Sequence, residues 1–377
     1  MPNATRATPL AAVLKQRIRE EGPITFAEFM RACLYDEQHG YYSKPEALRF
    51  ADYYTSVDVH PIFGRLLARQ LAEMWHRLGA PREFHIVEGG AGAGRLAAHI
   101  LDFAARELRD FYAALQYTAL ELSAARRAEH ARALAPHIAA GKLVSSALLP
   151  ARITAGCVFS NELLDALPVH RVVSASGALR EIYVALDGEE FIERPWSLST
   201  PEIGAYFSEQ AIVLADGQQA EAALDARRWI EEAGRVLESG FVLTVDYGHE
   251  AAELYGERHA SGTLLAYERH HASENWFDAL GEQDLTAHVN FTALDLAGRR
   301  AGLEPTGLVT QSHFLVALAQ ANQLADLEDA ALSETDRIRA RLLFKTLMHP
   351  EGLGEVFRVF VQHKGVANPQ LTGLLPL

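Results

Sequence analysis

Apolar residues change their spacing several times along the chain, and each change predicts a different kind of element. Up to residue 80 they recur at helical spacing, as in segment 61–79, PIFGRLLARQLAEMWHRLG. Within this part, Thr25 and Glu28 are spaced as in a capping box, which marks the start of a helix. We therefore expect a helical N-terminal region over residues 1–80.

From residue 81 the pattern becomes an alternation of short apolar runs with amphipathic stretches. Seven runs are expected to be strands: residues 84–89, 115–121, 142–146, 156–160, 240–247, 304–311 and 355–363. Strands that alternate with helices indicate βαβ units and a parallel sheet. We therefore predict an α/β protein with a seven-stranded Rossmann-like sheet that ends in an antiparallel hairpin.

Two segments interrupt this alternation and are interpreted as insertions. Residues 169–200 have the pattern of β-hairpins, and residues 249–290 form a long polar stretch with little regularity. The predicted organisation is a helical cap (1–80), the first part of the core (81–168), a β-rich insertion (169–218), a core helix and fifth strand (219–248), a loop-rich lid (249–290) and completion of the core with C-terminal strands (291–377).

Composition narrows the class of protein. The 377 residues carry 49 acidic against 35 basic side chains, a formal net charge of −14, which disfavours nucleic acid as a partner. The two cysteines, Cys33 and Cys157, are far apart and fit a reducing compartment. The sequence shows neither an apolar leader nor a long apolar run, so we expect a cytoplasmic protein without a membrane partner.

A glycine-rich loop follows the first predicted strand. In IVEGGAGAGRLAAHIL, residues 86–101, Gly90, Gly92 and Gly94 precede a helix. Such a loop lets a ligand approach the backbone and the N–H groups of the helix start. A phosphate-binding Walker loop is excluded, because no Gly-Lys-Ser/Thr follows. The dinucleotide pattern is matched only in relaxed form, so the loop alone allows a nicotinamide cofactor, another ligand, or a tight packing turn.

Two acidic residues favour one cofactor over the other. Glu121 closes the second strand, where a carboxylate binds the two hydroxyls of a ribose. Both NAD and S-adenosylmethionine contain this ribose. Glu88 directly precedes the glycines. Its charge would repel the pyrophosphate of a dinucleotide, whereas S-adenosylmethionine has a positive sulfonium and an amino group but no phosphate. Together the acids favour S-adenosylmethionine.

The segment FSNELLDALP, residues 159–168, follows the fourth strand, where open α/β sheets place active-site loops. Asn161 offers an amide, and Glu162 offers a carboxylate that could bind a guanidinium through two hydrogen bonds and help to remove its proton. The spacing equally suits a structural interpretation. In that case Asn161 caps a helix and Glu162 stabilises its first turn.

A third candidate segment, TVDYGHE, residues 244–250, ends the fifth strand. Asp246 and Tyr247 lie at the ligand-facing edge of the predicted sheet, and His249 follows in a loop. The histidines of the next segment, His259, His270, His271 and His288, lack the spacing of metal ligands, so no metal is expected. A G-x-S-x-G motif is also missing from the sequence, which argues against an α/β-hydrolase.

Several long segments together resemble the MidA-like methyltransferases. They are GPITFAEFMRACLYDEQHGYY, DYYTSVDVHPIFGRLLA, EGGAGAGRLAAHIL, SNELLDALPVHR, DYGH, GTLLAYERHH, GEQDLTAHVNFTAL and VFRVFVQHKG, and they span about residues 10–365. The resemblance implies a class I S-adenosylmethionine-dependent methyltransferase fold. The mitochondrial member of this family is a protein arginine methyltransferase that makes symmetric dimethylarginine on a subunit of respiratory complex I. Arginine in a protein substrate, here also a complex I subunit, is therefore the implied acceptor.

The resemblance and the patterns above define three groups of candidate residues. The catalytic candidates are Glu162, Asn161 and Asp246; the cofactor-binding candidates are Glu88, Gly90, Gly92, Gly94, Glu121 and Asn161; the substrate or lid candidates are Tyr41, Tyr42, Thr55, Ser56, Asp58, Tyr247 and His249. The family's Thr-Ser-Pro-Glu segment becomes Thr-Ser-Val-Asp here, with a shorter acid. The alternatives are an assembly chaperone without catalysis on the same fold, a methyltransferase for a different substrate, and a nicotinamide-dependent dehydrogenase.

Overall fold

The computed structural model describes residues 6–43, 61–268, 271–325, 333–348 and 357–377. The chain divides into two units. The core unit comprises Tyr54–Leu163, Ile230–Tyr247 and Asp295–Leu377, and the insertion unit comprises Met1–Tyr53, Leu164–Trp229 and Gly248–Leu294. Among the described helices, none combines the length and the apolar composition that a membrane span requires.

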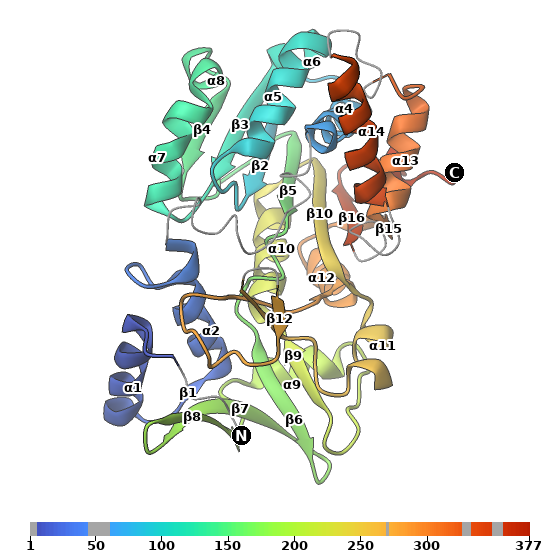
Figure 1. Cartoon of the computed structure of the whole chain (residues 1–377). Coiled ribbons are helices and arrows are strands. Elements are labelled where there is room, and N and C mark those ends of the chain that lie inside the picture. The colour runs from blue at the N-terminus through green and yellow to red at the C-terminus, as the bar shows by residue number, and fades with distance from the viewer. Residues whose placement is uncertain (1–5, 44–60, 269–270, 326–332, 349–356) are drawn as a thin grey trace. The chain divides into compact units, whose positions relative to one another are not determined.

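The core unit is built on one mixed sheet (Figure 1). Its strands are β2 (Phe84–Gly89), β3 (Leu115–Leu120), β4 (Leu143–Ser146), β5 (Gly156–Asn161), β10 (Gly240–His249), β15 (Glu304–Thr310) and β16 (Phe357–Lys364). The order is β15-β16-β10-β5-β2-β3-β4. Neighbours from β10 to β4 are parallel, whereas β16 is antiparallel to both β10 and β15. All seven predicted strands and the final antiparallel pair are therefore confirmed.

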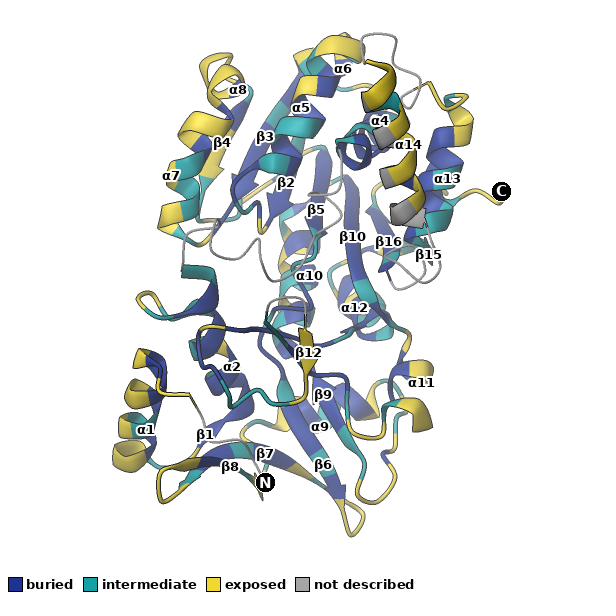
Figure 2. Ribbon diagram, viewed as in Figure 1, coloured by how far each residue is buried: buried dark blue, intermediate teal, exposed yellow. Residues whose placement is uncertain are grey.

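Helices cover this sheet because its central strands β2, β3, β5 and β10 are buried on both faces. They are α4 (Ile62–Arg77), α5 (Arg95–Glu107), α6 (Arg109–Ala114), α7 (Ala124–Ala133), α8 (Ala135–Ala139), α10 (Leu224–Val236), α12 (Phe291–Arg300), α13 (Gln311–Ala321) and α14 (Glu334–Met348). Buried side chains such as Ile86, Phe159 and Leu243 join the strands to α4 and α5 in one core. Figure 2 shows the buried strands beside the exposed outer faces of α7 and α8.

The insertion unit has an antiparallel sheet of five strands. They are β1 (Ile24–Thr25), β6 (His170–Ala175), β7 (Ala178–Asp187), β8 (Glu190–Trp196) and β9 (Gln219–Ala222), and their order is β1-β7-β6-β9 with β8 on β7. The two predicted hairpins are confirmed, since β6 pairs with β7 and β7 with β8. The helices α1 (Pro9–Glu21), α2 (Phe26–Tyr35) and α9 (Pro201–Ser208) belong to the same unit.

The predicted capping box at the start of α2 is confirmed. Thr25 Oγ1 accepts the N–H of Glu28 at 3.2 Å, and Glu28 Oε2 accepts the N–H of Thr25 at 3.0 Å. These two bonds satisfy backbone donors that the first helical turn leaves unpaired. The apolar face of α2 then packs into the core of the insertion unit through Phe26, Phe29 and Met30.

Residues 249–290 contain more regular structure than their sequence pattern indicates. The elements are α11 (Ala251–Leu254), the 3-10 helix η3 (Glu257–His259), β11 (Leu265–Glu268), β12 (His271–Ser273), β13 (Asp284–Thr286) and β14 (Val289–Asn290). Strands β12, β11 and β13 form a small sheet, and β14 pairs with the end of β10. These elements have two to four residues each, which is too short for a recognisable hydrophobic period.

Candidate cofactor and active site

The glycine loop connects β2 to α5 in the core unit. Gly90, Gly92 and Gly94 have φ angles of +69°, +56° and +84°, in the left-handed region that favours glycine. A Cβ on Gly90 would lie 2.9 Å from Leu163, and one on Gly94 would lie 2.8 Å from Leu134. A Cβ on Gly92 would meet only a terminal atom of an arginine, at 3.8 Å. The outer glycines therefore serve the turn, whereas the backbone at Gly92 remains approachable.

Glu121 lies beside this loop at the end of β3. It is buried, its Oε2 accepts the N–H of Gly92 at 2.9 Å, and its Oε1 accepts the N–H of Ser123 at 2.8 Å. A carboxylate oxygen has two lone pairs, so each oxygen keeps a further acceptor position for a ligand hydroxyl. The structure thus brings the predicted ribose acid and the predicted glycine loop together through a hydrogen bond.

Glu88 is buried near the end of β2, where Tyr117 Oη donates to its Oε2 at 2.7 Å. The pKa of Glu88 is raised to about 8, chiefly by burial; the hydrogen bond from Tyr117 opposes this rise, and the negative charge of Glu121 adds to it. The sequence interpretation treats Glu88 as a charged carboxylate, but in the ligand-free protein it is largely protonated at neutral pH. A cationic group bound beside it would favour the charged form.

This raised pKa predicts how stability depends on pH. Glu88 binds its proton more tightly in the folded state, so its contribution is fully present below pH 4.5 and is lost as the pH rises toward about 8. Because of Glu88, the free energy of unfolding of the wild type should fall by up to about 1.4 kcal/mol per pH unit over this range. We expect Glu88→Gln to remove this contribution. Chemical unfolding of the ligand-free protein at several pH values measures this slope.

The control for this measurement is Glu83→Gln, because Glu83 is an exposed acid that directly precedes β2. Its replacement makes the same chemical change without removing a buried acid. Parallel slopes for the wild type and Glu88→Gln would mean that Glu88 titrates normally in the folded protein, and would contradict the prediction.

The Asn-Glu segment forms a turn next to the glycine loop. Ser160 of β5 pairs with Gly89 of β2, so Asn161 and Glu162 follow the sheet edge beside Gly90. Glu162 has a φ of +52°, and the amide of Asn161 donates to its Oε1 at 3.1 Å. A non-glycine residue in this region costs roughly 1–2 kcal/mol. Such strained positions cluster at functional sites.

The helix-start interpretation of this segment is wrong. Residues 162–169 are all described, and they form turns and extended chain instead of a helix. The N–H of Glu162 donates to the carbonyl of Val245 at 2.9 Å, and the N–H of Leu163 donates to Asp246 Oδ2 at 3.2 Å. These bonds to β10 hold the turn against the sheet, so the backbone does not continue into a helix.

Asp246 is a support for this turn. It is fully buried in β10, and besides Leu163 it accepts the N–H of Tyr247 at its other oxygen, at 3.0 Å. Both oxygens therefore bind backbone groups. Asp246 thereby fixes the backbone of the turn at Leu163, next to Glu162. Tyr247 packs edge to face on Phe357, with ring centroids 5.4 Å apart.

Three other substrate or lid candidates, Tyr41, Tyr42 and His249, belong to the insertion unit. Tyr41 is buried in its core, and Tyr42 donates to both oxygens of Asp284, at 3.0 and 2.9 Å. His249 is the last residue of β10, next to Glu253. The candidates Thr55, Ser56 and Asp58 lie outside the described residues.

His130 is a site residue that the sequence analysis missed. It is fully buried in α7, its Nε2 lies 2.8 Å from the carbonyl oxygen of Gly92, and its Nδ1 lies 2.8 Å from Ser145 Oγ. A carbonyl only accepts, so Nε2 carries the proton and donates. His130 therefore fixes the loop from the carbonyl side as Glu121 does from the amide side. Its only sequence signal is a position on the buried face of a polar helix.

Comparison with known proteins agrees with this geometry. Residues 66–309 match the model of a family of S-adenosyl-L-methionine-dependent methyltransferases. A solved structure of a COG1565 superfamily member from Burkholderia thailandensis, bound to S-adenosyl-homocysteine, is 29% identical with a TM-score of 0.85 and covers 97% of this chain and 94% of its own. The chain is thus similar over nearly its whole length to a protein that binds the demethylated cofactor.

Curated relatives give a further comparison. The protein arginine methyltransferase NDUFAF7 homolog of Drosophila melanogaster is 27% identical over 95% of this chain and 85% of its own length. The human NDUFAF7 protein is 28% identical over 95% of this chain and 84% of its own. Both are named as mitochondrial proteins. This finding overturns the prediction of a cytoplasmic protein, which rested only on the lack of a leader or an apolar span.

The residues of the core unit fit S-adenosylmethionine. Glu121 has acceptor positions left for ribose hydroxyls, the backbone at Gly92 is approachable, and the buried acid Glu88 suits a cationic group. The sheet order and the single inverted strand β16 define the predicted class I fold. S-adenosylmethionine is accordingly the cofactor, and the chain belongs to this family of S-adenosyl-L-methionine-dependent methyltransferases.

Proposed function

We propose that this protein transfers methyl groups from S-adenosylmethionine to arginine side chains of a protein substrate. The observation that carries the proposal is the strained turn that holds Glu162 directly after β5, at the sheet edge where the neighbouring β2 leads into the glycine loop. The names of the Drosophila and human relatives support arginine as the acceptor. By family resemblance the proposal extends to symmetric dimethylation and to a subunit of respiratory complex I.

Cofactor binding is assigned to residues at the carboxyl edge of the parallel strands. Glu121 would accept hydrogen bonds from the ribose hydroxyls through its remaining lone pairs. The loop at Gly92 would lie against the cofactor, held in place by Glu121 and His130. Glu88 would favour the positive charges of the sulfonium and the amino group, and Asn161 would contribute its amide.

Glu162 would bind the acceptor. When bound, S-adenosylmethionine supplies a methyl group on a positively charged sulfur. A carboxylate can hold a guanidinium through two parallel hydrogen bonds, which orients one nitrogen. The guanidinium is too weak an acid to lose its proton beforehand. The carboxylate of Glu162 would therefore accept the proton as the nitrogen is methylated, while Asp246 keeps the turn in position.

Two measurements test the proposed function. Calorimetry with S-adenosylmethionine should show one binding event, and a purely structural chaperone would show none. Mass spectrometry of proteins from cells with and without this gene should then show the loss of methylation at one or a few specific arginines. If the protein binds the cofactor but its loss leaves every methylarginine site unchanged, arginine is not the acceptor. Methylation that is lost from another type of residue would identify that residue type as the acceptor.

A further inference from the structure

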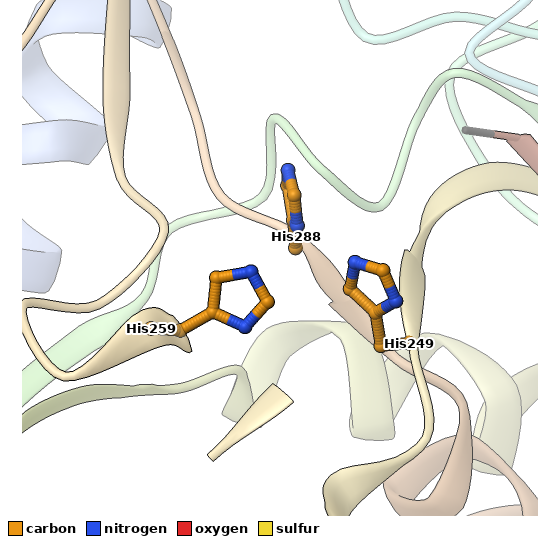
Figure 3. Close-up of side chains that lie close together, drawn as sticks. All are labelled: His249, His259 and His288. Carbon is orange, nitrogen blue, oxygen red and sulfur yellow. The ribbon is translucent and has the colours of Figure 1, made fainter. Parts of the chain in front are cut away.

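Three histidines from separate segments of the insertion unit come together. His249 ends β10, His259 ends η3, and His288 directly precedes β14. The parallel pairing of β10 with β14, which sets Gly248 opposite Val289, brings the first and the last of these segments side by side. One ring nitrogen from each histidine lies within 4.8 Å of the others, and Figure 3 shows the three rings grouped around a common space.

Glu253 in α11 lies beside two of the rings. Its Oε1 lies 3.1 Å from Nδ1 of His249, and its backbone carbonyl oxygen accepts a hydrogen bond from Nδ1 of His259 at 3.2 Å. The bond at His259 places the proton on Nδ1 and leaves the lone pair on Nε2, the arrangement that commonly holds metal-binding histidines. The backbone of the third residue, His288, is fixed by its N–H, which donates to Thr263 Oγ1 at 3.0 Å.

The surroundings of the cluster suit a cation. All three histidines are only partly buried, so an ion can reach them from solvent.

We propose that His249, His259 and His288 bind one divalent transition-metal ion, with Zn²⁺ as the preferred ion. Imidazole nitrogens suit zinc, copper and nickel better than magnesium or calcium. Zinc–nitrogen bonds of about 2.0–2.1 Å place tetrahedral ligands roughly 3.3 Å apart. The ring nitrogens, which now lie within 4.8 Å of one another, therefore approach by up to about 1.5 Å around the ion, and a water or a further ligand completes the fourth position.

No metal is expected from the sequence, because the histidines lack the spacing of metal ligands. The proposed ligands come from three separate segments, so their spacing in the sequence could not indicate this site. The ion would join the end of β10, η3 and the segment before β14, and so would stabilise residues 249–290 of the insertion unit. This inference is independent of the methyl acceptor and of cofactor binding.

Titration of the untagged, full-length, metal-stripped protein with Zn²⁺ tests the proposal. Calorimetry should show one equivalent in the wild type, and His259→Gln and His288→Gln should each lose it. Glu253→Gln should weaken binding by about 10-fold to 100-fold, because the second shell orients the ligands. The matched control is His271→Gln, since His271 is exposed in β12 and lies outside the cluster; it should keep the equivalent.

Two further readouts separate loss of the site from loss of folding. Co²⁺ should give the strong visible absorption of a tetrahedral histidine site in the wild type and the control, but not in the cluster variants. Zn²⁺ should raise the melting temperature of the wild type and of the His271→Gln control, but not of His259→Gln or His288→Gln, because it binds only the folded, intact cluster. Binding of S-adenosylmethionine should persist in every variant. No zinc equivalent in the wild type, or an equivalent that survives His259→Gln, would show that the histidines only pack against one another.

Discussion

Glu162→Gln should lower the rate of methyl transfer by about 10²-fold to 10⁴-fold, the range that general acid–base catalysis contributes. Glutamine keeps the shape and can still interact with Asn161, but it neither pairs with a guanidinium nor accepts its proton. Cofactor affinity should stay nearly unchanged, because Glu121 and the glycine loop are untouched. Single-turnover methylation of the substrate, with calorimetry for the cofactor, measures both quantities.

The backbone at Glu162 provides a second variant that keeps this prediction testable. Its φ of +52° is unfavourable for glutamate and ordinary for glycine. Glu162→Gly should therefore fold with an unchanged or slightly higher melting temperature while losing activity. The control Glu83→Gln makes the same chemical change at an exposed position and should keep full activity. Full turnover in Glu162→Gln would remove Glu162 from the mechanism.

The strain at Glu162 also shows where sequence reasoning stops. The sequence places Asn161 and Glu162 at the end of a strand, and this edge is where parallel strands collect active-site residues. Spacing could not separate a catalytic turn from a helix start. The segment forms a turn instead of a helix because its N–H groups donate to Asp246 and Val245, which lie far along the chain on β10.

In the rest of the fold, too, the features visible in the sequence are local, and those that it misses depend on tertiary contacts. The strands of the core unit are long apolar runs, so they could be predicted from the sequence. The strands β11, β12 and β13 are too short for that and form through tertiary pairing. The raised pKa of Glu88 depends on burial, and the histidine cluster depends on the pairing of β10 with β14. Neither is visible from local spacing.

Glu121→Ala should weaken the binding of S-adenosylmethionine by about 10²-fold to 10³-fold. Hydrogen bonds to a charged group contribute about 1.5–3 kcal/mol each, and the variant loses those to the ribose hydroxyls. It also releases the N–H groups of Gly92 and Ser123, so the loop loses its fixed position. The wild type and the variant should be compared by calorimetry with S-adenosylmethionine and with S-adenosylhomocysteine.

Comparing the affinities for S-adenosylmethionine and S-adenosylhomocysteine separates the roles of Glu121 and Glu88. Glu121 faces the loop, and its proposed partner is the ribose, which both ligands share, so Glu121→Ala should weaken them equally. Glu88 is proposed to respond to positive charge, so Glu88→Gln should weaken S-adenosylmethionine more than S-adenosylhomocysteine, which lacks the sulfonium. Equal affinity of Glu121→Ala and the wild type would mean that Glu121 only holds the loop through Gly92 and Ser123, and that the ribose binds elsewhere on the sheet edge.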